Sequence, residues 1–116
     1  MSNNSYPVNT HHSYHAHLYF DESTFEVALE ILAKIENNFS LKVGRKHKKL
    51  VGPHPMWSCQ ILFGSNSFST LIPWLDENRR GLSVLVHPVT QDDLYDHTEL
   101  AAWLGDKKVL NLALFY

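Results

Sequence analysis

The sequence places several histidines where their side chains could share one face of a β-sheet. Two of them, His15 and His17, lie one residue apart in the apolar segment YHAHLYF at residues 14–20. Because strand side chains alternate between the two faces of a sheet, both project opposite Ala16 and Leu18. A buried imidazole needs a partner for each ring nitrogen. The pattern indicates either hydrogen-bonded filling of the core or a site that holds something.

The same alternation places two further histidines on that face. His87 belongs to the polar set of LSVLVHP at residues 82–88, and His54 precedes MWSCQILFG at residues 56–64, whose polar side it shares if that strand starts early. One such histidine is commonly a hydrogen-bonded filler, whereas four favour a shared metal or active site. Neutral imidazole is a ligand for Zn, Cu, Fe and Ni. Three protein ligands with an open position make a catalytic site rather than a closed structural one.

A fifth histidine, His97, belongs to a segment with helical periodicity. It shares a predicted helix face with Leu94, Leu100 and Ala101, so we expect it to point inward beside Asp96. A satisfied core histidine and a functional histidine remain equal alternatives at this position.

The hydrophobic pattern predicts the elements that position these residues. Strands are expected at residues 14–20, 39–43, 56–64, 82–88 and 109–116, and helices within 21–38, 65–81 and 92–105. The order predicts an α+β fold, a ferredoxin-like split βαβ antiparallel sheet with helices on one face, plus an extra C-terminal helix and strand. In that fold the strand at 14–20 lies between those at 56–64 and 82–88, so His87 falls beside His15.

Local residues support the three predicted helices. Ser23 and Glu26 match a capping box for the first, and Pro73 predicts a kink in the second. Gly105 stands where the third helix is expected to end.

Composition sets the class of protein. The 116 residues are predicted to form one domain at 14–116 after a disordered tail at 1–13. With 10 basic and 12 acidic residues the net charge is −2, which offers no general attraction to nucleic acid or an anionic membrane. No run is long enough to span a membrane and no signal peptide is apparent. The single cysteine, Cys59, is compatible with a reducing cytosol, so a cytoplasmic protein is expected.

Four motifs follow one another from residue 14 to residue 105: YHAHLYF, VGPHPMWSCQILF, LIPWLDENRRGLSVLVHPVT and LYDHTELAAWLG. Together, in this order, they resemble the DOPA 4,5-dioxygenase family of small extradiol ring-cleaving enzymes. The resemblance implies a non-haem Fe(II) enzyme that uses O₂ to open the ring of DOPA or a related catechol. It also implies a homodimer, for which the helix-free face of the sheet, needing a cover, is the expected interface.

The resemblance also implies roles for the histidines. Iron binding falls to a subset of His15, His17, His54 and His87, and we expect the ligands to be His17, His54 and His87. His15 and His97 are then the expected acid–base catalysts, since the pKa of histidine lies near neutrality. Tyr19, Gln60 and Ser83 share the predicted face and are expected to line the substrate pocket, with Arg79 or the basic loop at residues 44–55 meeting a substrate carboxylate.

Two points leave alternatives open. Many non-haem Fe(II) oxygenases use two histidines and a carboxylate, so a loop carboxylate could join the site, with Asp21 and Asp96 the nearest. Other functions on the same fold are a non-enzymatic dimeric protein that binds a small aromatic ligand and a Zn²⁺ protein without redox chemistry. Zinc could also replace iron in purified protein, because such sites bind Zn²⁺ more tightly than Fe²⁺.

Overall fold

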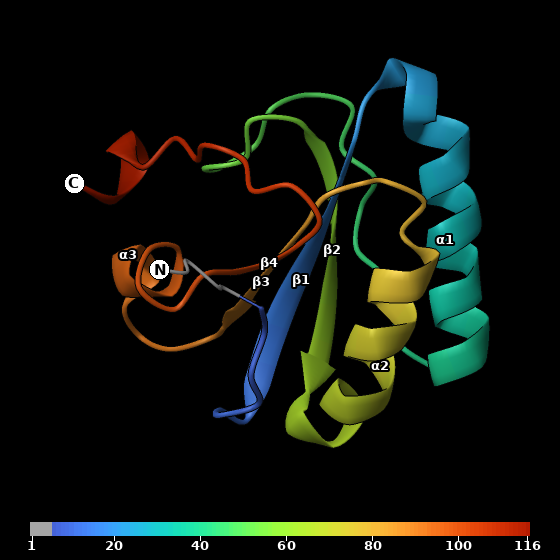
Figure 1. Cartoon of the computed structure of the whole chain (residues 1–116). Helices are drawn as coiled ribbons and strands as arrows, with labels where there is room; N and C mark the ends of the chain where they lie inside the picture. The colour runs from blue at the N-terminus through green and yellow to red at the C-terminus, as the bar shows by residue number, and fades with distance from the viewer. Residues whose placement is uncertain (1–5) are drawn as a thin grey trace.

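The computed structural model describes residues 6–116 and has an α+β architecture with the two long helices on one face of an antiparallel sheet (Figure 1). The strands, in the order β2-β1-β3-β4, are β1 (Ser13–Phe20), β2 (Trp57–Gly64), β3 (Val84–Pro88) and β4 (Ala102–Leu104). The helices are α1 (Phe25–Phe39), α2 (Ser65–Asn78) and the short α3 (Asp93–Asp96), with 3₁₀ turns at Glu22–Thr24 and Ala113–Phe115. The predicted fold class is confirmed.

The helix-covered face holds the main core. In both long helices, apolar residues recur every three or four positions and point at the sheet, as expected for amphipathic helices. The buried residues include Ala28, Ile31, Leu32 and Ile35 from α1, Phe68, Leu71, Ile72 and Leu75 from α2, and the alternate strand residues Ala16, Leu18, Ile61, Phe63, Val84 and Val86. This packing fixes which side of each strand faces away from the helices.

The central strand β1 is antiparallel to both of its neighbours. In its register Ala16 pairs with Ile61 of β2, while His15 pairs directly with His87 of β3. The predicted neighbours of the first strand are therefore confirmed, and the register brings two of the histidines opposite each other.

The strand predicted at 39–43 is absent. The left-handed backbone of Ser40 (φ 55°) ends α1, and the chain then meets the outer edge of β2 only through isolated bridges of Val43 to Ile61 and His47 to Ser58. The alternation of this segment thus reflects three side chains that pack against the main core, Phe39, Leu41 and Val43, rather than a paired strand.

The C-terminal helix and strand are present, but the helix is shorter than predicted and the strand lies elsewhere. The helix spans only Asp93–Asp96, and the strand is Ala102–Leu104, which pairs with β3, rather than 109–116. Residues 97–104 do not continue the helix, although their sequence has helical periodicity. The outer edge of β3 offers unpaired backbone N–H and C=O groups, and the hydrogen bonds that β4 forms with them outweigh the local helix propensity. Residues 105–112 have no regular structure before the turn at Ala113–Phe115.

Three residue-level predictions concern the ends and the interior of the helices. The capping box is formed by Asp21 and Thr24 at the turn before α1, not by Ser23 and Glu26. Pro73 lies inside α2, and the helix continues beyond it to Asn78. Gly105 has a positive φ of 79°, but it follows β4 rather than a helix.

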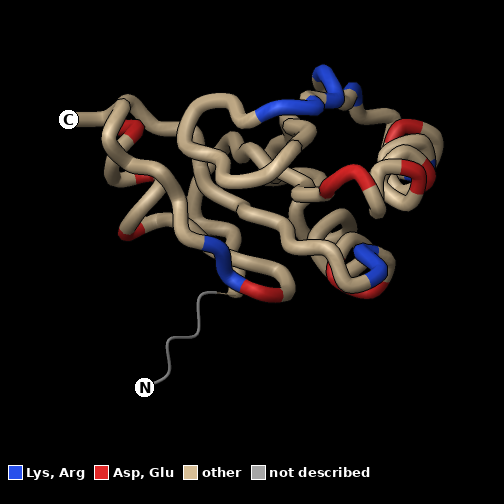
Figure 2. The backbone as a smooth tube through the Cα atoms, turned by 90° about the horizontal axis from the view of Figure 1, so that it is seen from above, with Lys and Arg blue, Asp and Glu red and all other residues tan. Residues whose placement is uncertain are grey.

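Of the predicted tail, residues 1–5 lie outside the described residues. Residues 6–12 have no regular secondary structure, and the Asn9 side-chain amide donates to the carbonyl of Ser65 at 3.2 Å. No helix within residues 6–116 combines the length and apolarity needed to cross a membrane. The four strands contain no Lys, Arg, Asp or Glu, and Figure 2 shows the charged residues on helices and loops around them.

Candidate functional site

Three histidines converge on the helix-free face of the sheet. His15 and His17 come from β1 and His87 from β3, and each offers a ring nitrogen such that all three atoms lie within 4.8 Å of one another. The Nε2 atoms of His17 and His87 are 3.1 Å apart. Two nitrogens that each lie about 2.1 Å from one metal ion, at an angle of about 90–110°, are about 3.0–3.4 Å apart. The spacing therefore fits two adjacent ligands of a single metal ion.

Burial keeps these imidazoles neutral. It lowers the pKa of His17 well below the ordinary value and that of His87 to about 4, and it lowers the pKa of the more exposed His15 as well. Neighbouring histidines add to the effect because like charges disfavour protonation. A neutral imidazole retains the lone pair that binds a metal, so the donor set fits a metal ion of the type that takes nitrogen ligands.

The orientation of His87 is set from outside the cluster. Its Nδ1 donates a hydrogen bond to the carbonyl oxygen of Pro88 at 2.8 Å, since a carbonyl can only accept. The neutral ring then carries its lone pair on Nε2, the atom that faces His17. A backbone carbonyl on the second nitrogen is the common support of a metal-binding histidine.

His54 enters the site from the loop before β2. Its ring lies 4.2 Å from that of His17, and its Nδ1 is 2.8 Å from the hydroxyl of Tyr19. Burial lowers the pKa of His54 to about 4 and raises that of Tyr19, so at neutral pH the pair is a neutral phenol beside a neutral imidazole. This hydrogen bond is a path along which a proton can pass between the two side chains.

His97 borders the site from the residue that ends α3. Its Nδ1 donates to the carbonyl of Asp93 at 2.7 Å, and its ring lies 4.2 Å from that of His87 and 4.9 Å from that of Phe115. The preceding Asp96 is buried, and its carboxylate accepts hydrogen bonds from the Thr90 amide (2.9 Å) and hydroxyl (2.6 Å). This link fixes the loop between β3 and α3 that presents His97.

The five histidines line one cavity of about 240 Å³. Gln60 and Asp96 also line it, as do Pro53, Val89, Asp93 and Phe115. Tyr19, which was expected to line the pocket, does not line the cavity itself but forms a hydrogen bond with His54, which does. Of the two carboxylates considered from the sequence, Asp96 borders the cavity, whereas Asp21 caps the turn before α1.

Two residues expected in the pocket lie elsewhere. The guanidinium of Arg79 forms an ion pair with Asp76 and donates to the carbonyl of Leu82. The hydroxyl of Ser83 donates to the carbonyl of Asp106 at 2.6 Å. Neither residue lines the histidine cavity, and the cations of the basic loop at residues 44–55 do not line it either.

Four lining residues were not predicted from the sequence, and three of them lie outside the strands and α-helices. Phe115 lies in the C-terminal 3₁₀ turn, in a segment predicted to be a strand, Pro53 precedes His54 in a loop, and Val89 follows β3. No periodicity could have assigned these three side chains to a face, because face parity holds only inside a strand or helix. The fourth, Asp93, begins α3, within the segment that was predicted to be a helix.

Comparison with known proteins agrees with this geometry. A model of the Dopa 4,5-dioxygenase family matches residues 14–114. The chain is 34% identical over 109 residues to a DOPA 4,5-dioxygenase of Amanita muscaria, covering 86% of this chain and 48% of that protein. It is 36% identical over 112 residues to an uncharacterised 21.2 kDa protein of Botryotinia fuckeliana, covering 89% and 60%. The chain thus spans about half to three-fifths of the length of these curated relatives.

A solved structure shares the fold. The crystal structure of a candidate dioxygenase from Nostoc punctiforme superposes with a TM-score of 0.85 at 39% identity, covering 88% of this chain and 89% of that one. Since the family model matches nearly the whole described chain, and the motifs that it spans carry the clustered histidines, the chain belongs to the Dopa 4,5-dioxygenase family.

Proposed function

We propose that this chain is an extradiol dioxygenase that opens the ring of DOPA or a related catechol with O₂ at a non-haem Fe(II). The observation that carries the proposal is the group of neutral histidines His15, His17 and His87, the last two of them buried, whose donor atoms lie within 4.8 Å of one another. Bound Fe(II) would supply the one-electron chemistry that allows O₂ to react with a catechol.

In this proposal the compact group His15, His17 and His87 binds the metal. The assignment exchanges the roles that the sequence suggested for His15 and His54, because His15 belongs to the group within 4.8 Å and His54 does not. His87 is oriented for the task by its bond to the Pro88 carbonyl. Asp96, with both carboxylate oxygens occupied by Thr90, supports the site without binding metal.

His54 and His97 handle protons. The low pKa of His54 leaves it unprotonated at neutral pH, so it can accept a proton from a catechol hydroxyl. In the tautomer whose Nδ1–H donates to the Tyr19 hydroxyl oxygen, the lone pair on Nε2 of His54 is left to accept that proton. His97, partly exposed beside His87, is placed to return a proton to the opened product. Gln60 lines the same cavity and is a further partner for the substrate.

The test is anaerobic reconstitution with Fe(II), followed by air and L-DOPA, with O₂ uptake and a yellow ring-opened product as the readouts. We expect iron-dependent product from the unaltered protein and from His12→Ala, whose histidine is exposed outside the cavity. Tight catechol binding without O₂ uptake would instead support a non-enzymatic binding protein. Zn²⁺ binding with neither catechol binding nor turnover would support the redox-inactive alternative.

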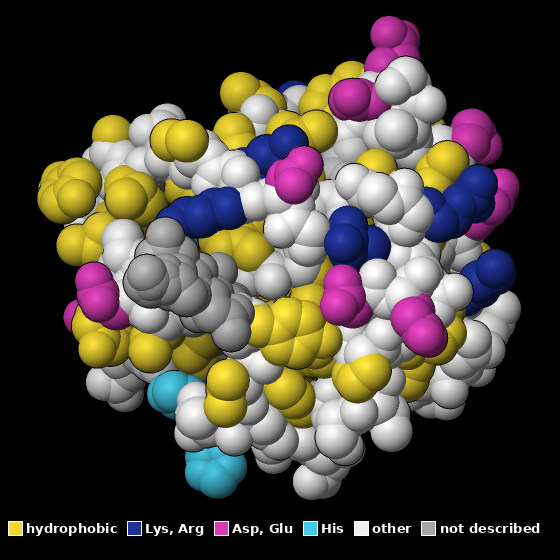
Figure 3. All heavy atoms as spheres, viewed as in Figure 1, with side chains coloured by type: hydrophobic (Ala, Val, Ile, Leu, Met, Phe, Trp, Pro, Cys, Tyr) yellow, Lys and Arg dark blue, Asp and Glu magenta, His cyan; other side chains and the backbone are white. Residues whose placement is uncertain are grey.

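The proposal includes a cytoplasmic homodimer. Figure 3 shows hydrophobic side chains gathered around the C-terminal end of the chain, where Val109, Leu114 and Tyr116 are exposed. A second copy of the chain that covers this patch would shield these apolar side chains, on the helix-free side of the sheet, from water. Light scattering after size-exclusion chromatography tests the dimer, and a monomer at micromolar concentration would contradict it.

A further inference from the structure

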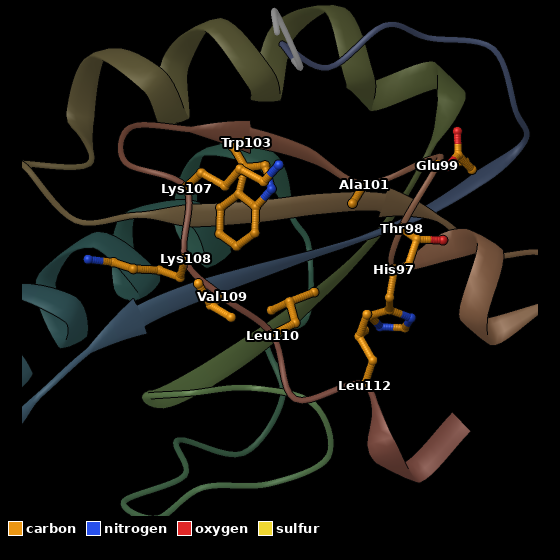
Figure 4. Close-up of a pocket in the computed structure, with 10 residues that line it drawn as sticks. All are labelled: His97, Thr98, Glu99, Ala101, Trp103, Lys107, Lys108, Val109, Leu110 and Leu112. Carbon is orange, nitrogen blue, oxygen red and sulfur yellow. The ribbon is translucent and has the colours of Figure 1, made fainter. Parts of the chain in front are cut away.

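A second, larger cavity adjoins the histidine site on the helix-free side of the sheet. It lies between β4 and the C-terminal segment at residues 107–112 and has a volume of about 520 Å³ (Figure 4). Sites for small molecules usually measure about 300–1,000 Å³. The histidine cavity, at about 240 Å³, falls below that range. A ligand larger than a bare ring therefore needs space beyond the histidines.

The two cavities share the side chain of His97. This residue lines both, with its ring against His87 on the side of the histidine cluster. In Figure 4 it stands at one end of the larger cavity, close to Leu112. A substituent that leaves the histidine cavity past His97 consequently enters the second cavity.

The body of the second cavity is apolar. Trp103 of β4 is almost fully buried and packs with Tyr19 and Leu85 on the helix-free face. Leu110 and Leu112 of the C-terminal segment line the same space. An aliphatic chain placed here would lose its water to these side chains, which favours an arm of carbon atoms over a polar one.

Charge distinguishes the two ends of the cavity. In Figure 4, Lys107 and Lys108 lie at the end away from His97, and Glu99 lies at the end nearer to it. Neither lysine forms an ion pair with any residue that the structure describes. Glu99 repels an anion from one end while the lysines attract it to the other. The polarity of the cavity thus matches an arm whose anionic group is remote from the reacting ring.

We propose, on the basis of the dioxygenase function above, that this cavity binds the side arm of a catechol substrate that ends in a carboxylate. Lys107 and Lys108 are the specificity-determining residues that pair with this carboxylate, and Trp103 is the surface on which the aliphatic part of the arm packs. They replace the two carboxylate partners suggested by the sequence, Arg79 and the basic loop at residues 44–55. The guanidinium of Arg79 is paired with Asp76, and neither Arg79 nor the loop lines this cavity.

The test compares two catechols that differ only in the end of the arm. Binding of 3-(3,4-dihydroxyphenyl)propanoate and of 4-propylcatechol is measured by equilibrium dialysis with Fe(II)-loaded protein under anaerobic conditions. We expect the double variant Lys107→Ala with Lys108→Ala to bind the carboxylate roughly tenfold more weakly, the scale of a lost charge-assisted hydrogen bond. Binding of 4-propylcatechol should change less than about twofold, because its arm lacks the charge.

A matched control removes the same charge elsewhere. Lys46 and Lys49 are exposed in the basic loop and line neither cavity, so replacing both by Ala should leave both affinities unchanged. The proposal is overturned if the Lys107 and Lys108 double variant weakens both catechols equally, if it changes neither, or if neither catechol binds the unaltered protein. An equal loss in the control variant would also overturn it, because net charge alone would then explain the effect.

This test separates the inference from the function on which it rests. Dialysis without O₂ reports the arm site even if no ring opening occurs, whereas O₂ uptake reports the dioxygenase reaction. If turnover is observed, the double variant should raise KM for the carboxylate substrate and leave kcat within about twofold, since the lysines lie beyond His97 from the reacting ring. A loss of kcat with unchanged KM would contradict a role in substrate recognition.

Discussion

The two faces of the sheet are made by the same strands but carry different kinds of side chain. The face towards α1 and α2 is apolar and closed by regular helices, with residues such as Ile61 and Leu71 fully buried. The other face carries histidines in place of aliphatic residues, together with a small apolar cluster of Tyr19, Leu85 and Trp103. Loops, the short helix α3 and the C-terminal segment lie over it in place of long helices (Figure 1).

The difference separates stability from chemistry. Apolar burial on the helix-covered face supplies the larger part of the folding free energy, since it scales with apolar area removed from water. The neutral histidines of the other face contribute less to folding but bring three ring nitrogens within 4.8 Å of one another. Substitutions on the two faces should therefore have different consequences.

The largest effect is expected from the histidine face. Replacing His17 by Ala removes a proposed ligand from the centre of the cluster, and we expect turnover to fall by about 10³-fold or more, with metal affinity reduced by at least tenfold. Thermal unfolding of the metal-free variant should remain cooperative because the helix-covered core is untouched. Stopped turnover with full iron content, measured by metal analysis, would mean that His17 acts on protons instead. Collapse of the fold would mean that its role is structural.

The converse experiment concerns the helix-covered face. Leu71 of α2 is completely buried in the main core, so Leu71→Ala leaves a cavity and should lower the free energy of unfolding by about 3 kcal/mol. Urea unfolding measures this loss. Below the unfolding transition, metal stoichiometry and kcat should stay within about twofold of the unaltered protein. A large fall in kcat at full folding would show that the two faces are coupled.

A smaller effect is expected from pH in the metal-free protein. The folded state holds the pKa of His54 and of His87 at about 4, whereas in the unfolded chain it is about 6.5. Between these values the unfolded chain binds more protons, so stability is full above pH 6.5, falls as the pH is lowered and levels off below about 4. We expect a loss of about 2 kcal/mol between pH 7 and 5, less than two independent shifts would give because protonation opens the cluster to water.

Urea unfolding in chelator at several pH values measures this slope. His54→Gln should flatten it, and His12→Gln, at an exposed position, should not. A slope that is unchanged by His54→Gln would assign the pH dependence to other groups. Stability that rises on acidification would contradict the burial of neutral imidazoles.

How far the sequence predicts the molecule also differs between the faces. The alternation in residues 14–20 and 82–88 was enough to place His15, His17 and His87 on one side, because a strand fixes the direction of each side chain locally. The order of the strands then brought His15 opposite His87, as expected. The helix-covered face followed from periodicity in the same way.

The elements over the histidine face were not predictable by these means. Residues 94–104 have helical periodicity, but the structure that they adopt depends on the unpaired edge of β3. Residues 102–104 pair with this edge as a strand, with Trp103 opposite Leu85. The C-terminal segment is held by single contacts, such as the hydrogen bond that the backbone N–H of Asn111 donates to the backbone carbonyl of Pro53 at 2.8 Å. Such contacts join distant positions and leave no local pattern in the sequence.

The smallest effect is expected at the surface of the helix-covered side, where Arg80 forms an ion pair with Glu30 of α1 at 2.6 Å. Both side chains are more than half exposed (54% and 63%), so water and salt screen the attraction and ordering two long side chains offsets much of it. A double-mutant cycle with Arg80→Gln and Glu30→Gln should give a coupling below about 1 kcal/mol that shrinks in 0.5 M NaCl.

A coupling well above that value, unchanged by salt, would show that a polar contact helps to hold the helices on the sheet. The division between the faces would then be less sharp than the burial pattern indicates. A weak, salt-sensitive coupling would mean that hydrophobic packing alone fixes α1 relative to the end of α2. Polar side chains would then determine structure mainly on the opposite face, where the buried Asp96 carboxylate binds Thr90 and burial protects its hydrogen bonds from the same screening.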